Sequence, residues 1–100
     1  MNNCRIIYYD LETTGLDSEN DEIIEIAGKD NNGEIFSKLL KPSKEISDRI
    51  EEITGINNRN LKYRNTLEQN KEKINNWFDF KNKRNYLIAH NGDRFDLKFL

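Results

Sequence analysis

Two acidic residues near the start of the chain, Asp10 and Glu12, have the type and the spacing of a metal-binding pair. They follow an apolar run at residues 5–9 that predicts a strand. Side chains alternate along a strand, so residues two apart project from the same side. Two carboxylates at the end of a buried strand are unfavourable unless a cation offsets their charge. Mg²⁺ and Mn²⁺ prefer such oxygen ligands, and two of these ions roughly 3.5–4 Å apart can hydrolyse a phosphodiester. Taken alone, the pair also fits a solvated strand end.

Three segments in and around this pair follow one another in a pattern shared with a family of nucleases. They are Asp10-Leu11-Glu12-Thr13-Thr14-Gly15-Leu16, then Ile53-Thr54-Gly55-Ile56, then the segment from Leu87 to Asp96 that contains His90-Asn91 and Phe95-Asp96. In this order they resemble the motifs of the DEDD 3′→5′ exonucleases, the superfamily of proofreading subunits, ribonuclease T and oligoribonuclease. Residues 22–28 also resemble the second strand of that family. The resemblance covers nearly the whole chain and implies a metal-dependent 3′→5′ exonuclease.

The resemblance implies that Asp10, Glu12 and Asp96 are the catalytic, metal-binding carboxylates of a site for two Mg²⁺ or Mn²⁺ ions. The third motif of the family, His-x-x-x-Asp or Tyr-x-x-x-Asp, supplies a fourth carboxylate and the general base, and residues 1–100 do not contain it. His90 is the single histidine, and we interpret it as a structural turn residue. We therefore expect residues 1–100 to form one exonuclease domain that is C-terminally truncated and hydrolyses slowly by itself.

Four further residues match substrate-binding positions of the family. Thr13 and Leu16 match positions that hold the 3′-terminal nucleotide, whereas Asn91 and Phe95 match positions near the substrate strand. A core position explains Phe95 equally well. The Thr-Thr-Gly and Thr-Gly-Ile segments favour the subgroup of the family whose general base is a histidine.

The charge of the chain is small but unevenly distributed. Charged residues make up 34% of the 100 residues and the formal net charge is −2, which argues against a general nucleic-acid coat protein. Residues 1–58 hold 6 Lys and Arg against 13 Asp and Glu, whereas residues 59–84 hold 8 against 3. An acidic region for cations beside a basic region for phosphates suits a nuclease. A solvated helix face explains the basic stretch at least as well.

The cysteine content and the absence of long apolar runs bear on the compartment. Cys4 is the single cysteine, so no internal disulfide can form and a reducing compartment is expected. No signal peptide and no membrane-spanning stretch is visible. We expect an intracellular protein, cytoplasmic or nuclear, with no membrane partner.

The first half of the chain predicts strands and then a short helix. Residues 5–9, 22–28 and 34–40 are strand candidates, and the Asp-Asn-Asn-Gly segment at 30–33 favours a hairpin between the last two. Ile46, Ile50 and Ile53 recur at helical spacing and predict a short helix that Gly55 ends.

The second half predicts a longer helix, a buried strand over residues 86–89 and a final helix from Asp93. Thr66 and Gln69 form a capping box that opens the longer helix. Its apolar residues share one face, so Trp77 is expected in the core rather than as a platform for bases. These residues are Leu67, Ile74, Trp77 and Phe78.

The predicted elements and the resemblance together imply an α/β fold with a ribonuclease H-like mixed sheet. Three antiparallel strands are expected beside a fourth strand parallel to the first, with flanking helices. A parallel fourth strand would bring Asp96 beside Asp10 and Glu12. The chain is apolar up to its last residue, which is a first sign of truncation. Because the last strand and helices of the family's fold are missing, we expect a bare sheet face that self-associates or binds a C-terminal complementing fragment.

The expected partner is the 3′ end of single-stranded DNA or RNA, and the expected products are nucleoside monophosphates. One alternative is a catalytically incomplete exonuclease-fold fragment that acts as a nucleic-acid-binding or interaction module. Another alternative is an endonuclease of the same broad fold.

Overall fold

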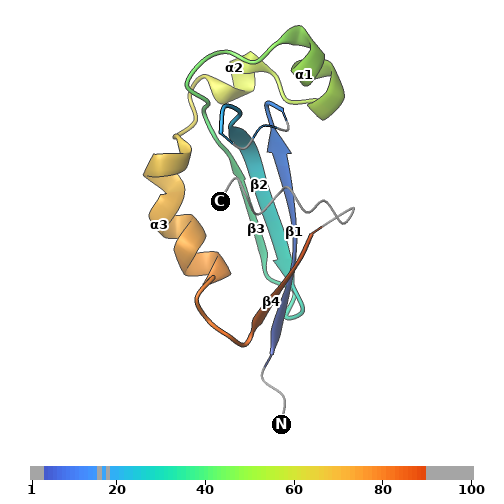
Figure 1. The fold of residues 1–100 in the computed structure, drawn as a ribbon, viewed down its shortest axis with the longest axis vertical. Helices are drawn as coiled ribbons and strands as arrows, with labels where there is room; N and C mark the ends of the chain where they lie inside the picture. Colours follow the sequence, from blue (N-terminus) through green and yellow to red (C-terminus); the bar gives the residue numbers. More distant parts are fainter. Residues whose placement is uncertain (1–3, 16, 18, 90–100) are drawn as a thin grey trace.

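The computed structural model describes residues 4–15, 17 and 19–89. Within them the elements are, in chain order, β1 (Arg5–Thr13), β2 (Ile23–Asp30), β3 (Ile35–Leu39), α1 (Asp48–Thr54), α2 (Asn58–Leu61), α3 (Leu67–Phe78) and β4 (Asn85–Ala89). The strands form a sheet in the order β3-β2-β1-β4. Figure 1 shows α3 beside this sheet, with α1 and α2 gathered at one end. The predicted α/β fold is confirmed, and β1 continues four residues beyond the predicted strand, so that it includes Asp10 and Glu12.

β2 and β3 are joined by a tight turn whose geometry depends on Asp30. Its Oδ1 atom accepts hydrogen bonds from the backbone N–H groups of Asn32 and Glu34, both at 2.9 Å. Gly33 has a φ of 87°, a conformation that glycine adopts without strain. The β1–β2 and β2–β3 pairs are both antiparallel. The predicted hairpin and the antiparallel start of the sheet are therefore confirmed.

β4 runs parallel to β1, with Arg5 opposite Asn85 and Tyr9 opposite Ala89. A parallel pair requires a long crossover connection, and here the connection from the β2–β3 hairpin to β4 contains α1, α2 and α3. The prediction of a fourth strand parallel to the first is confirmed. Because Ala89 lies opposite Tyr9, the described chain ends beside the residue that precedes Asp10.

α3 begins at the capping box that the sequence predicts. Thr66 Oγ1 accepts a hydrogen bond from the backbone N–H of Gln69 at 3.1 Å, and Gln69 Oε1 accepts one from the Thr66 N–H at 2.8 Å. Ile74 and Phe78 are buried in the main apolar cluster, and Trp77 packs against it. Trp77 is therefore a core side chain, as its helical spacing predicts.

The aromatic side chains of α3 come close to the sheet because β2 carries Gly28 at the contact. Trp77 stacks on Phe36 of β3 with ring centroids 5.4 Å apart, and Phe78 meets Trp77 edge to face at 4.9 Å. A Cβ atom at residue 28 would lie 2.7 Å from Trp77 Cζ3 and 3.1 Å from Phe78 Cζ. The missing side chain of Gly28 therefore makes the room that both rings occupy.

A second apolar cluster holds α1 and α2 at the end of the sheet. It consists of Ile24, Ile46, Ile56 and Leu61. α1 ends at Gly55, which has a φ of 75°, as the sequence predicts. α2 is missing from the predicted order because four residues are too few to show a helical period. Its one signal in the sequence is Asn57, whose side chain accepts a hydrogen bond from the Asn60 N–H.

The sheet face that points away from α3 is partly exposed. Tyr8 of β1 is 52% exposed, and Tyr86 and Ile88 of β4 are 55% and 44% exposed. The prediction of buried strands over residues 5–9 and 86–89 is wrong for this face. The physical reason is that the described helices bury the other face and one end of the sheet.

Arg5 and Asp30 form an ion pair between the first residue of β1 and the last residue of β2. Arg5 Nε lies 2.9 Å from Asp30 Oδ2, and the two side chains are 19% and 0% exposed. Arg5 also donates a hydrogen bond to the Trp77 carbonyl, and its guanidinium carbon lies 4.4 Å from the Trp77 ring centroid. Burial raises the pKa of Asp30, but the hydrogen bonds from Arg5 and from the backbone of Glu34 and Asn32, together with the Arg5 charge, outweigh burial and hold this pKa below its ordinary value.

We expect Gly28→Ala to destabilise the protein by about 1–3 kcal/mol, because the added methyl group overlaps Trp77 and Phe78. Urea denaturation of the two proteins measures this difference. The matched control is the same substitution in a Trp77→Leu background, where the nearer ring atom is gone. The loss caused by Gly28→Ala should be smaller there, and an equal loss in both backgrounds would rule out the steric explanation.

We expect Asp30→Asn to destabilise the protein by roughly 3 kcal/mol at pH 7, because it leaves the mostly buried Arg5 without its counter-charge. The folded-state pKa of Asp30 is depressed, so its stabilising effect is present above the ordinary value of 3.8 and disappears as the pH falls through the folded-state pKa. Urea denaturation at a series of pH values should therefore show wild type and variant converging in acid. A difference that stays constant with pH would contradict the ion-pair explanation.

Candidate functional site

Asp10 and Glu12 lie on β1 and point away from α3. The residues that alternate with them, Tyr9 and Leu11, are buried in the main apolar cluster, whereas the two acidic residues are only partly buried. The alternation of side chains along a strand therefore puts both carboxylates on the same side of the sheet, as predicted. This is the face that carries the exposed Tyr8.

Glu25 of β2 is a further carboxylate on this face, and the sequence analysis missed it. It lies directly opposite Glu12 in the β1–β2 pair. Burial raises the pKa of Glu25, and the negative charge of Asp10 raises it further. The order Ile24-Glu25-Ile26 could have indicated it, because successive side chains of a strand point to opposite faces and a charged residue between two apolar ones therefore lies on the face away from the core.

Asp10, Glu12 and Glu25 put three carboxylates on one face of the sheet, and their charges affect whether a metal ion binds here. Burial is the main cause of the raised pKa of Glu25, and the charge of Asp10 adds to it because the ionised forms of these two carboxylates repel each other. A divalent cation relieves that repulsion, and carboxylate oxygens are the ligands that Mg²⁺ and Mn²⁺ prefer. Asp10 and Glu12 therefore supply the kind of ligand that suits the metal ions implied by the resemblance.

The loop after β1 fixes the position of Thr13. The register of the β1–β2 pair shifts between Glu12 and Thr13. Thr13 Oγ1 then donates a hydrogen bond to the Gly15 carbonyl at 2.5 Å, and Thr14 Oγ1 donates one to Asp21 Oδ1 at 3.1 Å. A Cβ atom on Gly15 would lie 2.3 Å from Asp21 Oδ2, so a side chain at this position would displace the Asp21 carboxylate that binds Thr14.

The structure places Asp10 and Glu12 on one face of β1, with Thr13 directly after Glu12 at the shift in register. The other predicted site residues lie outside the described residues: Leu16, Asn91, Phe95 and Asp96. So do His90 and the helix predicted from Asp93. Within residues 4–15, 17 and 19–89, no three His, Cys, Asp or Glu side chains form a group that could hold a metal ion.

Comparison with protein families supplies the decisive observation. A family model described as "RNase_T: Exonuclease" matches residues 7–100. The chain belongs to this exonuclease family. The match begins at Ile7 in β1 and includes all the predicted site residues. Exonucleases of this family generally use divalent metal ions.

Two relatives show how much of an exonuclease-family protein this chain represents. A "DNA polymerase III PolC-type" from Thermotoga petrophila is 41% identical over 102 residues, which cover 98% of this chain and 7% of the relative. A "3′-5′ exonuclease DinG" from Bacillus subtilis is 37% identical over 105 residues, which cover 100% of this chain and 11% of the relative. The chain thus spans about a tenth or less of the length of these relatives.

Solved structures of exonuclease I share the fold of this exonuclease-family chain. Escherichia coli exonuclease I in complex with a dT13 oligonucleotide gives a TM-score of 0.80 at 19% identity, covering 97% of this chain and 22% of that one. Exonuclease I from Methylocaldum szegediense gives 0.79 at 24% identity, covering 96% and 22%. These likenesses confirm the ribonuclease H-like mixed sheet.

We expect the protein to bind Mn²⁺ at the face of Asp10 and Glu12, and the double variant Asp10→Ala/Glu12→Ala to bind it at least about tenfold more weakly, because both carboxylate ligands are gone. Water-proton relaxation enhancement during a Mn²⁺ titration measures this affinity. Glu52→Ala/Glu72→Ala removes the same charge from exposed positions on α1 and α3 and should leave the affinity within about twofold. Unchanged binding in the first variant would remove the proposed site.

Proposed function

We propose that this chain carries the metal-binding part of a 3′→5′ exonuclease that releases nucleoside monophosphates from single-stranded nucleic acid. The observation that carries the proposal is that Asp10 and Glu12 lie on one face of a strand in a chain that belongs to an exonuclease family. In this proposal residues 1–100 form an exonuclease domain that contains the first two motifs of the family and not the third.

The proposed cofactor is a pair of Mg²⁺ or Mn²⁺ ions held by Asp10, Glu12 and Asp96. When bound, such ions supply an activated water and stabilise the charge on the leaving oxygen. The chain's own contribution is to fix two of these carboxylates on a hydrogen-bonded strand, so that little reorganisation accompanies binding. Glu25 adds negative charge beside them, which favours occupation of the site by cations.

The proposed substrate is single-stranded DNA. Two observations favour DNA over RNA: one relative is a DNA polymerase, and one solved neighbour is described in complex with a dT13 oligonucleotide. We assign the 3′-terminal nucleotide to Thr13 and Leu16, and the adjoining strand to Asn91 and Phe95. No helix in the described part of the chain has the length and apolar character needed to cross a membrane.

A second candidate function is an interaction module, and one observation favours it. The sheet face that carries the acidic residues also exposes Tyr8, Tyr86 and Ile88 by 44–55%. Exposed apolar groups of this size commonly mark a surface that another chain covers. In this proposal the face associates with a second copy of the chain or with a complementing segment that carries the third motif.

We expect the protein to shorten a 5′-labelled single strand from its 3′ end in the presence of Mn²⁺ or Mg²⁺, and to release nucleoside monophosphates. Asp10→Asn/Glu12→Gln should reduce the rate by about a hundredfold or more, because about 3 kcal/mol of metal-dependent stabilisation is lost. Gel analysis of the labelled strand and chromatography of the products measure both effects. Glu52→Gln/Glu72→Gln is the matched control and should retain the wild-type rate.

Two other outcomes distinguish the alternatives. Cleavage of a circular single strand, which has no ends, would identify an endonuclease and contradict the exonuclease proposal. A folded protein that releases no nucleotide with either metal, and that sediments as a dimer or larger assembly, would support the interaction module instead.

A further inference from the structure

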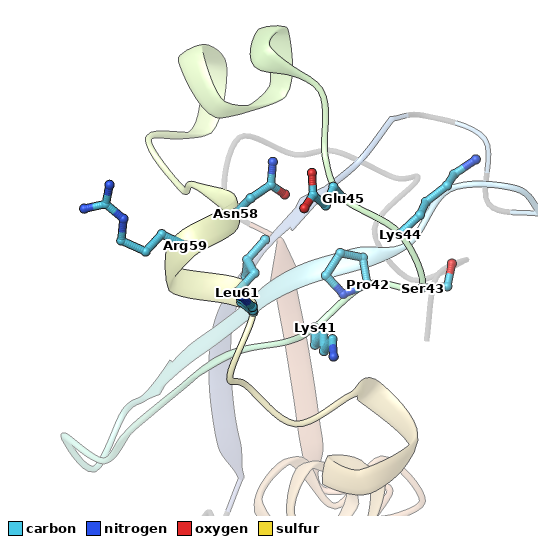
Figure 2. A pocket seen from close by; sticks show the side chains of 9 residues that line it. Lys41, Pro42, Ser43, Lys44, Glu45, Asn58, Arg59 and Leu61 are labelled. Atoms are coloured by element: carbon cyan, nitrogen blue, oxygen red, sulfur yellow. The ribbon is translucent and has the colours of Figure 1, made fainter.

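A basic pocket lies between α2 and the segment that follows β3 (Figure 2). Its volume is about 520 Å³. The cations that line it are Lys41, Lys44, Arg59 and Lys62, against one carboxylate, Glu45. Figure 2 shows Pro42 and Leu61 in the middle, with the side chains of Arg59 and Lys44 on opposite sides. Pro42 and Leu61 are buried, so the pocket has an apolar floor and a basic rim.

The walls of the basic pocket are fixed by hydrogen bonds that do not use its cationic groups. The Asn58 side chain binds both backbone groups of Ile46, with distances of 2.8 and 2.9 Å. The Lys41 backbone N–H donates to the Asn65 carbonyl at 3.0 Å. Within the described residues, none of the four cations has a carboxylate partner at salt-bridge distance. Their charges are therefore available to a ligand in a preformed pocket.

An exposed aromatic residue adjoins the basic pocket. Tyr63 follows Lys62 and is 84% exposed. Lys62 Nζ lies 5.5 Å from the centroid of the Tyr63 ring. Tyr63 itself lines a smaller pocket of about 260 Å³, together with Lys38 and Arg64 among others. Cations beside an exposed aromatic ring are the combination with which proteins bind single strands, because the cations take phosphates and the ring stacks on a base.

The basic pocket is connected to the loop that follows the predicted metal ligands. Glu22 accepts hydrogen bonds from the Ser43 N–H at 3.0 Å and from the Ser43 hydroxyl at 2.7 Å. The backbone of Glu22 in turn pairs with Thr14, whose N–H donates to the Glu22 carbonyl at 2.9 Å. Ser43 lines the pocket, and Thr14 follows Thr13. The pocket and the loop after Thr13 are therefore joined by a short chain of hydrogen bonds at one end of the sheet.

The basic stretch of the sequence, residues 59–84, is divided in space. Arg59, Lys62 and Arg64 lie at α2 and just after it, near the end of the sheet where β1 finishes (Figure 1). Lys81 and Lys83 lie in the α3–β4 connection at the opposite end of the molecule. The cations at α2 and those in the α3–β4 connection therefore lie at opposite ends of the molecule (Figure 1).

We propose that the basic pocket and Tyr63 bind the single strand upstream of its 3′-terminal nucleotide, with the cations on phosphates and Tyr63 stacked on a base. The direction of the strand rests on the proposed exonuclease function, whereas the binding itself does not. This contact strengthens binding of the strand and takes no part in its hydrolysis.

The test measures the anisotropy of a 5′-fluorescein dT12 strand in EDTA, where metal-dependent hydrolysis does not occur. Arg59→Glu/Lys62→Glu should weaken binding at least tenfold and reduce the slope of log affinity against log salt by about 1.4, the loss of two phosphate contacts. Lys81→Glu/Lys83→Glu makes the same charge change far from the pocket and should alter the affinity by less than twofold. Tyr63→Ala should weaken binding at least fivefold and Tyr63→Phe less than twofold, because phenylalanine keeps the ring.

Equal weakening by the two charge reversals would overturn the proposal, because net charge rather than the pocket would then explain binding. So would equal competition against dT12 by polyglutamate of the same total charge, or no measurable binding by the wild type. Wild-type hydrolysis of thymidine 5′-p-nitrophenyl phosphate with Mn²⁺ tests the metal centre separately. If that hydrolysis fails while the pocket variants still weaken dT12 binding, the proposed exonuclease function falls and the binding surface stands.

Discussion

The ion pair of Arg5 and Asp30 is the constraint on which the arrangement of the sheet and helix depends. It joins the start of β1 to the end of β2, and Arg5 reaches from there to the ring and carbonyl of Trp77 at the end of α3. Asp30 at the same time shapes the β2–β3 turn through two backbone N–H groups. This buried carboxylate supports the register in which Glu12, seven residues after Arg5 on β1, lies opposite Glu25. A slip of one residue would turn every side chain of β1 to the other face.

The two ends of β1 have opposite electrostatic character. At its start a carboxylate is matched by a guanidinium and by hydrogen bonds, which lower its pKa. Toward its end carboxylates face one another, and the pKa of Glu25 is raised. The first arrangement stabilises the fold, whereas the second is a strain that the fold tolerates. Proteins commonly concentrate such unfavourable groups where a ligand relieves them.

Much of the fold was predictable because its signals are local. The Asp30–Gly33 turn, the Thr66 capping box and the end of α1 at Gly55 each depend on a few adjacent residues, and all three are confirmed. α2 was not predictable from periodicity, since it has four residues. The exposure of Tyr8 and Ile88 was also missed, because an apolar strand does not reveal which of its faces a helix covers. Asp10 and Glu12 could be identified from the sequence motif that contains them. Glu25 could not, because only the strand register shows that it lies opposite Glu12.

The parallel pairing of β1 with β4 has a consequence for the order in which the molecule forms. Arg5 and Asn85 are paired although 80 residues separate them, whereas β1, β2 and β3 are joined by short connections. Closing so long a loop is entropically unfavourable and contributes to slow folding. During synthesis the β1–β2–β3 meander can form before β4 has left the ribosome. Ala89 and Tyr9 come side by side only after that closure. The end of β4 therefore reaches the strand that carries Asp10 and Glu12 only in the last long-range step of folding, so a partly made chain presents these carboxylates on a sheet that still lacks its fourth strand.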